Sequence, residues 1–160
     1  MKIAVFADTH GRSGPMLSLI ERLRPDHVIH LGDYLRDGDE ICDLFPDLPT
    51  TLVAGNNDLC AREPSEKWEK IGGRMFYLSH GHQFPAQARE RLLLKRAAEG
   101  RAELVLFGHT HVGVCREENG VWLLNPGSLC LPRDGKKSFA LIELSEKGVA
   151  PTLEDAAEWM

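Results

Sequence analysis

The 160-residue sequence predicts one α/β domain, a length that suits a single hydrophobic core. Three short apolar runs in the first third of the chain each end in a polar turn, as strands buried on both faces do. Segments with helical spacing separate these runs, which gives the order β-α-β-α-β. No internal repeat, low-complexity segment or linker interrupts the chain, so we expect a single domain over residues 1–160.

The first strand is expected at 2–7 (KIAVFA), which is rich in β-branched and aromatic residues. Ser13 is a candidate helix cap, and apolar residues then recur at helical spacing until Arg24-Pro25. The second strand is expected at 27–31, and a short helix at 39–44. The third strand is expected at 50–54, ending in GNND.

The rest of the chain mixes hairpins with one clear helix. Residues 68–79 read as two strands joined by Gly72-Gly73, and a second hairpin turns at Asn119-Gly120. Between the hairpins, the pattern predicts a helix at 86–98 with Ala88, Leu92 and Leu93 facing inward. We further expect a buried strand at 103–107, a strand with one wet face at 138–144, and a weakly patterned tail at 148–160.

Composition and charge narrow the function classes. With 42% hydrophobic and 27% charged residues, the chain is typical of globular proteins. A net charge of −5 argues against binding long nucleic acids, which would need a basic face. It is compatible with a small phosphorylated substrate, because bound metal ions would supply positive charge locally.

The four cysteines are widely spaced and form no CxxC pair, so we expect reduced thiols. The apolar run near the N-terminus is too short for a secretion signal, and no run approaches the roughly 20 residues of a membrane span. These features predict a cytoplasmic protein with no membrane partner.

Every predicted turn after a buried strand carries possible metal ligands. In open α/β sheets, ligands bind beyond the carboxyl ends of the strands. Carboxylates, imidazoles and amide carbonyls are the ligand types that borderline divalent metals accept. The candidate ligands in these turns are Asp8, His10, Asp33, Asn56, His80, His109 and His111.

Extended-chain alternation predicts that Asp8 and His10 point to one side, and likewise His109 and His111, so each pair could hold one ion or divide between two. A single GD, GNND or HxH motif is often an ordinary turn. Their combination at five strand ends favours a metal site. His27 and His30 lie inside a strand and are interpreted as packed residues.

With DTH at 8–10, GD at 32–33, GNND at 55–58, HGH at 80–82 and GHTH at 109–111, the chain resembles the calcineurin-like metallophosphoesterase family. NPGS at 125–128 is similar to its small bacterial and archaeal phosphodiesterase branch. The resemblance implies a four-layer α/β/β/α metallophosphoesterase sandwich, in which two mixed sheets are flanked by helices. It also implies a binuclear-metal-dependent phosphoesterase, most simply a phosphodiesterase, in which a metal-bound hydroxide attacks a small phosphate ester.

The same resemblance implies a ligand set. Asp8, His10 and His111 would hold one ion, and Asn56, His80 and His109 the other. Asp33 would bridge the two ions. Mn²⁺ is the expected metal, with iron, nickel or zinc as alternatives that suit mixed oxygen and nitrogen ligands.

The sequence departs from the family pattern at one position. Many larger members carry a histidine after the motif asparagine, where it can protonate the leaving group, but here the residue is Asn57. An amide can donate a hydrogen bond to a phosphate oxygen but cannot act as a general acid. We therefore assign a catalytic role to Asn57 as a donor and to His82 as a substitute proton source, with water as the alternative source. Asp58 either orients a ligand or caps its own turn.

The sequence is also compared with two rival functions. The same fold serves as a protein-interaction subunit, for example in retromer, so the chain could be a catalytically weak or inactive scaffold. A zinc-dependent amide hydrolase is disfavoured, because the HxHxDH run of that class is missing. The apolar VWLLNP segment at 121–126 leaves a homo-oligomer possible. Trp68 and Trp122 are assigned to the core or to an interface.

Overall fold

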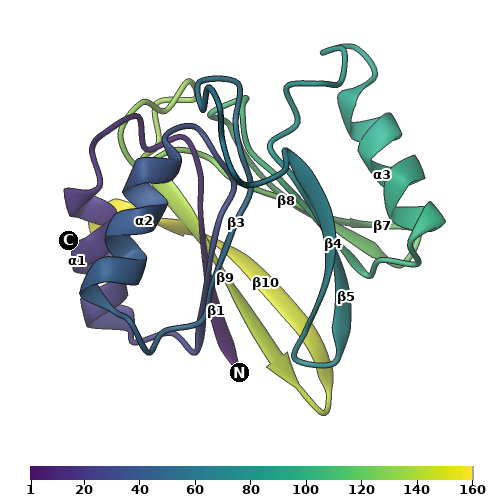
Figure 1. Cartoon of the computed structure of the whole chain (residues 1–160). Coiled ribbons are helices and arrows are strands. Elements are labelled where there is room, and N and C mark those ends of the chain that lie inside the picture. The colour runs from purple at the N-terminus through teal and green to yellow at the C-terminus, as the bar shows by residue number, and fades with distance from the viewer. Residues whose placement is uncertain (160) are drawn as a thin grey trace.

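The computed structural model describes residues 1–159. Two five-stranded sheets pack face to face, with strand orders β10-β9-β1-β2-β3 and β4-β5-β6-β8-β7. Helices α1 and α2 cover the outer face of the first sheet, and α3 lies on the outer side of the second (Figure 1). The predicted four-layer α/β/β/α sandwich of two mixed sheets is therefore confirmed.

The first sheet is built around β1 (Lys2–Phe6). This strand pairs in parallel with β2 (His27–His30) and antiparallel with β9 (Ser138–Ser145). Outside these lie β3 (Thr50–Leu52), parallel to β2, and β10 (Gly148–Asp155), antiparallel to β9. The three parallel strands all end at the same edge of the sheet.

The second sheet has a parallel centre and antiparallel edges. β6 (Leu104–Phe107) pairs in parallel with β5 (Arg74–Ser79) and with β8 (Val121–Pro126). β4 (Glu66–Ile71) and β7 (Gly113–Glu118) form the edges as hairpin partners of β5 and β8. β5 and β6 thus point their carboxyl ends in one direction.

Three apolar clusters hold the four layers together. The inner cluster fills the space between the sheets and contains Ile3, Val5, Phe76 and Leu106 among its buried members. A second cluster joins α1 (Gly14–Leu23) to the first sheet. A third packs α3 (Arg89–Glu99) on the second sheet through Leu93 and Ala97. Burial at about 25 cal/mol per Å² makes these clusters the main source of stability.

Helix boundaries differ from the prediction in both later helices. α2 spans Leu35–Leu44 and so begins four residues before the predicted start at 39. α3 begins at Arg89 rather than 86, and its fully buried residues are Leu93 and Ala97. Ala88 and Leu92, which were expected to face inward, are only half-buried.

Ser13 precedes α1 as expected, but its side chain makes no capping hydrogen bond. Its hydroxyl instead donates to Oε2 of Glu40 in α2. Pro15 in the first turn removes one amide that would otherwise need a cap. Ser13 therefore links α1 to α2, on the same face of the sheet, instead of capping α1.

The C-terminal segment, predicted as a weakly patterned tail, contains regular secondary structure. Residues 148–155 form β10, which pairs with β9 over its whole length, and a 3₁₀ helix follows at Ala156–Glu158. β9 is buried from Ser138 to Ile142 because both of its faces are covered: Phe139 and Leu141 pack in the cluster with α1, and Ala140 and Ile142 pack in the inner cluster. The predicted wet face is limited to its last residues. Pro151 is tolerated because β10 is an edge strand.

Both predicted hairpin turns are confirmed. Asn119 and Gly120 have φ values of 52° and 80°, and Gly72 and Gly73 have φ values of 56° and 83°. Positive φ at both central residues is the requirement of a two-residue type I′ turn, which asparagine and glycine meet most easily.

Trp68 is 37% exposed and packs on Tyr77 with ring centroids 4.8 Å apart, and Trp122 packs against the inner cluster. Within residues 1–159, all four cysteines are free thiols. No helix in the described part of the chain is both long and apolar enough to span a bilayer.

Candidate metal centre

The carboxyl ends of five strands meet at one edge of the sandwich. Asp8 follows β1, Asp33 follows β2, and the Asn56 turn follows β3 in the first sheet. His80 follows β5 directly, and the turn with His109 and His111 follows β6 in the second sheet. Contacts between these residues join the two sheets at this edge.

Left-handed backbone conformations shape these turns. Asp8, His10, Asp33, His109 and His111 have φ values between 49° and 68°. The prediction that these side chains point to one side because the chain is extended therefore had the wrong physical reason. Non-glycine residues are uncommon in this region and often mark functional sites. Each strand ends in a sharp turn that returns a polar side chain to the sheet edge.

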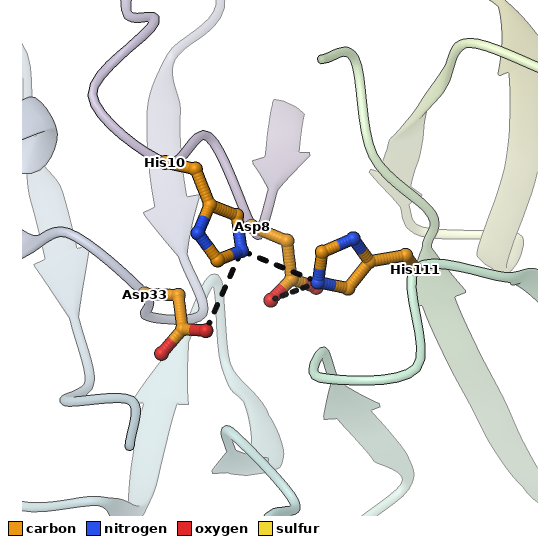
Figure 2. Close-up of side chains that lie close together, drawn as sticks. All are labelled: Asp8, His10, Asp33 and His111. Carbon is orange, nitrogen blue, oxygen red and sulfur yellow. Dashed lines mark hydrogen bonds and ion pairs between the residues drawn. The ribbon is translucent and has the colours of Figure 1, made fainter. Parts of the chain in front are cut away.

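Four of the predicted ligands form a compact cluster: one ligand atom from each of Asp8, His10, Asp33 and His111 lies within 4.8 Å of the others. Figure 2 shows these side chains pointing toward one another from three separate turns. The Nε2 atoms of His10 and His111 are 3.3 Å apart. Nε2 of His10 lies 3.5 Å from Oδ2 of Asp33, and Nε2 of His111 lies 3.5 Å from Oδ1 of Asp8.

A second group adjoins the first through Asp33. Nε2 of His80 lies 3.4 Å from Oδ1 of Asp33 and 3.2 Å from Oδ1 of Asn56. The ring of His109 packs edge-on against His80 at a centroid distance of 5.2 Å. His109 and His111 therefore divide between the two groups, and Asp33 has one oxygen facing His10 and the other facing His80.

Hydrogen bonds fix the protonation of two of these histidines. Nδ1 of His80 donates to the carbonyl of Leu31 at 2.7 Å, and Nδ1 of His111 donates to the carbonyl of Leu131 at 2.8 Å. When neutral, each ring then presents an unprotonated Nε2 to the centre, which is the form that binds metals.

Burial keeps His80 in that form by lowering its pKa to about 4. The lone pair of Nε2 then faces the Asn56 carbonyl oxygen, which is also an acceptor. Two acceptors at this distance repel each other unless a proton or a cation lies between them. A divalent cation fits this arrangement.

Asp8 also has an acceptor atom in the centre without a donor. Its Oδ2 accepts a 2.9 Å hydrogen bond from the backbone amide of His109. Its Oδ1 is buried and has no hydrogen-bond partner within residues 1–159. Burial, with a further contribution from the charge of Asp33, raises the pKa of Asp8 to about 8. A buried carboxylate normally has a cationic partner, so the donor set fits a bound metal ion.

Asp33 is held ionised by its neighbours. Burial alone would raise its pKa, but the nearby His80 and two hydrogen bonds from Asn57 hold the pKa below its ordinary value. The backbone amide of Asn57 donates to Oδ1 at 3.0 Å, and its side-chain amide donates to Oδ2 at 2.8 Å. Asn57 was predicted to contact the substrate, yet its side-chain donor is directed at Asp33.

The other predicted residues take distinct places. His82 lies beside the second group, with its ring 5.4 Å from His80 and 6.2 Å from His109. Its Nδ1 is buried without a partner among residues 1–159. Asp58 accepts hydrogen bonds from the amides of Gly55 and Leu35, so it caps its own turn and the start of α2.

His27 and His30 are buried within β2, as predicted. His27 hydrogen-bonds to Thr51 at 2.8 Å, and His30 to Thr9 at 2.9 Å. Neither histidine belongs to the ligand cluster found within residues 1–159.

Two basic residues near the centre were missed in the sequence. Arg133 is exposed, its backbone amide donates to the carbonyl of His111 at 3.0 Å, and its charge helps to lower the pKa of His111. Arg89 also acts on the centre, because its charge, after burial, lowers the pKa of His109. Arg133 stands five residues after the NPGS motif, which was the available signal. Arg89 has no signal in the sequence, since it lies among other helix arginines.

Comparison with known proteins agrees with this geometry. Residues 1–147 match the family model described as the calcineurin-like phosphoesterase superfamily domain. A probable metallophosphoesterase of Mycoplasma genitalium is 36% identical over 138 residues, which cover 84% of this chain and 80% of that protein. A phosphodiesterase of Methanocaldococcus jannaschii is 26% identical, covering 92% of this chain and 95% of that one.

Solved structures share the fold. A predicted phosphoesterase from Streptococcus pneumoniae has a TM-score of 0.82 and 27% identity, covering 98% of this chain and 90% of that one. Vps29 of Entamoeba histolytica in complex with Zn²⁺ has a TM-score of 0.73 and 24% identity, covering 98% of this chain and 99% of that one. At that identity, the second likeness concerns the fold alone.

Proposed function

Since the chain belongs to the calcineurin-like phosphoesterase superfamily, we propose that it hydrolyses small phosphodiesters at a centre of two divalent metal ions. The observation that carries the proposal is the convergence of unprotonated imidazole nitrogens on two buried carboxylates, one of which, Asp8, has an Oδ1 atom without a hydrogen-bond donor among residues 1–159. Family membership implies divalent metal binding. The number of ions, the roles of the residues and the substrate class are proposed here.

The proposed ligands divide according to the two groups of side chains. Asp8, His10 and His111 would hold the first ion, and Asn56, His80 and His109 the second. Asp33 would bridge them, which is supported by its two oxygens facing His10 and His80 at 3.5 and 3.4 Å. A bridging carboxylate reduces the repulsion between two cations, and neutral imidazoles leave net positive charge for the substrate.

When bound by these residues, two divalent ions would supply a water of lowered pKa and positive charge for the phosphate. The protein residues supply the rest. The guanidinium of Arg133 adds a positive charge near the phosphoryl oxygens, and Asn57 holds Asp33 ionised and oriented. His82, which packs beside His80, is the proposed donor of a proton to the leaving oxygen.

A preference for good leaving groups follows from the weak provision for acid catalysis. The GNND motif has Asn57 where a histidine would protonate the leaving group, so esters with good leaving groups should react fastest. The Methanocaldococcus jannaschii relative is itself named a phosphodiesterase. Mn²⁺ is the proposed metal, with iron, nickel and zinc as alternatives that suit the same mixed donor set.

A non-catalytic scaffold is the second candidate, because the fold is shared with Vps29. The complete set of seven donors favours catalysis. The proposed substrate is small, and a homo-oligomer is a further proposal.

The experiment is a screen of metal-free and Mn²⁺-loaded protein against phosphomonoesters and phosphodiesters, beginning with bis(p-nitrophenyl) phosphate. The proposal expects turnover of the diester only with metal, reversed by a chelator. Asp33→Asn should abolish it. No turnover with any divalent metal would support the scaffold instead.

A further inference from the structure

A cavity of about 590 Å³ opens between α3 and the edge strand β7. One wall comes from the start of α3 and the segment before it, and the other from the outer face of β7. The volume lies within the roughly 300–1,000 Å³ that is usual for small-ligand sites. The metal ligands do not line this cavity, and the proposed function leaves it without a role.

The walls combine apolar surface with polar edges. Leu94 of α3 and Val112 and Val114 beside or within β7 supply aliphatic surface. Gln87 and Asn119 supply amides that can both donate and accept hydrogen bonds. This combination suits a flat ring whose faces are apolar and whose edge carries hydrogen-bonding groups.

The arginines that line the cavity also favour a flat ring as its ligand. Arg89, Arg91 and Arg116 all contribute to its lining. Planar guanidinium groups stack on aromatic ring faces as well as binding anions. Glu90 and Glu118 also line the cavity and pair with Arg116 at 2.7 and 3.5 Å. Arg116 is therefore neutralised locally, while no ion pair within residues 1–159 involves Arg89.

The cavity adjoins the metal centre at two points. Thr110 lines it and stands between His109 and His111 in the chain. Arg89 lines it too, and donates from Nε to the carbonyl of Gly81 at 3.0 Å and from Nη2 to that of Phe84 at 3.2 Å. Gly81 separates His80 from His82. A substrate phosphate at the centre would thus lie beside the mouth of the cavity, next to Arg89.

We propose that this cavity binds a nucleoside that forms one of the two ester groups of the substrate phosphodiester. The base would stack between the aliphatic walls and the arginines, and Arg89 would lie at the junction of nucleoside and phosphate. This inference rests on the proposed phosphodiesterase function, which it narrows to nucleotide diesters.

The test compares two diesters that share a leaving group. Thymidine 5′-(p-nitrophenyl phosphate) and methyl p-nitrophenyl phosphate both release p-nitrophenolate, so they differ only in the retained group. For the Mn²⁺-loaded wild type, kcat/KM should be at least tenfold higher for the thymidine ester. Binding of thymidine 5′-monophosphate, measured by calorimetry, gives a readout that does not depend on turnover.

Filling the cavity should weaken both the preference for the thymidine ester and the binding of thymidine 5′-monophosphate. In Val114→Trp, the thymidine ester should lose at least fivefold in kcat/KM and thymidine 5′-monophosphate should bind at least fivefold more weakly, while the methyl ester changes less than twofold. Leu94→Trp fills the cavity from the opposite wall and repeats the test if the first variant folds poorly. Ala98→Trp adds the same bulk on the exposed side of α3 and should change neither readout.

The outcomes separate the two proposals. Equal rates for both esters in the wild type would overturn the nucleoside site and leave the phosphodiesterase intact. Equal losses on both esters in Val114→Trp would assign the cavity to the aryl group and would also overturn it. Nucleotide binding that is sensitive to Val114→Trp, without turnover of either ester, would support the cavity and contradict the proposed function. Neither binding nor turnover would overturn both.

Discussion

The side-chain amide of Asn57 donates a 2.8 Å hydrogen bond to Oδ2 of Asp33, while its backbone amide donates to Oδ1 of the same carboxylate. One residue thus satisfies both oxygens of the proposed bridging ligand. This arrangement gives Asn57 a positioning role in the centre. It also explains how an amide is useful at a position where larger family members carry a general acid.

Replacing Asn57 with alanine should weaken the centre without removing a proposed ligand. Loss of a hydrogen bond to a metal ligand typically costs about 10–100-fold in metal affinity or activity. We expect Mn²⁺ affinity, measured by calorimetry, and diester turnover to fall together by this amount. Asn57→Asp is the stricter variant, because it replaces a donor with a second carboxylate beside Asp33. Unchanged Mn²⁺ affinity in Asn57→Ala would contradict the positioning role.

The rate should depend steeply on the leaving group. If Asn57 supplies no proton, aryl methyl phosphodiesters with leaving groups of rising pKa should react progressively more slowly. His82→Gln should steepen this dependence further, because His82 is the proposed proton source. The measurement is kcat/KM across the series for both proteins at fixed Mn²⁺. A flat dependence in the wild type would refute the idea that acid assistance is weak.

Much of the centre could be predicted because its residues sit in sequence motifs. The apolar runs identified the strands, and parallel strands bring their carboxyl ends to one edge, so the ligand candidates had to meet there. The local geometry could not be predicted. Asp8 and His111 adopt left-handed conformations that sequence alternation cannot express, and the direction of the Asn57 amide depends on a turn held by Asp58.

Stability of the metal-free protein should decrease between about pH 7.5 and 8.5. The pKa of Asp8 is raised to about 8, so the folded state holds a proton in this range that the unfolded state, with an Asp pKa near 4, has released. The buried histidines with lowered pKa act in the opposite direction, but their contribution is complete at about pH 7.5, where unfolded histidines with a pKa near 6.5 have lost their protons. Asp8 therefore dominates the change in stability above about pH 7.5.

We expect the melting temperature without metal to be about 1 °C or more lower at pH 8.5 than at pH 7.5. A change of about 1 kcal/mol moves it by roughly 2–4 °C in a domain of this size. Saturating Mn²⁺ should reverse the decrease, because it binds the ionised carboxylate of the folded state. Asp8→Asn is the control and should show neither the decrease nor the gain with metal. A metal-free wild type that is more stable at pH 8.5 than at pH 7.5 would contradict the raised pKa of Asp8.

A single methyl group at Gly55 should disrupt the centre. A Cβ at this position would overlap Oδ1 and the backbone nitrogen of Asp33, so the bridging carboxylate would have to move. Gly55→Ala should therefore lose at least tenfold in Mn²⁺ affinity while remaining folded by circular dichroism. Gly14→Ala is the matched control, since a Cβ there meets no atom within 4 Å. Normal metal binding in Gly55→Ala would show that the close approach is not required.

The segments that were least well predicted depend on tertiary contacts. β10 contains a proline and no clean alternation, and it becomes a strand because β9 offers it an open edge. α3 starts three residues later than predicted because residues 86–88 form a turn, in which the amide of Ala88 donates to the carbonyl of Pro85. No motif in the sequence predicts the cavity beside α3.

The most direct test of the two-ion centre is an anomalous-scattering map from crystals of the Mn²⁺-loaded protein. The account predicts two peaks about 3.5–4 Å apart. One should lie among Asp8, His10 and His111, the other among Asn56, His80 and His109, with Asp33 between them. A single peak in a fully loaded crystal, or peaks away from these side chains, would contradict it.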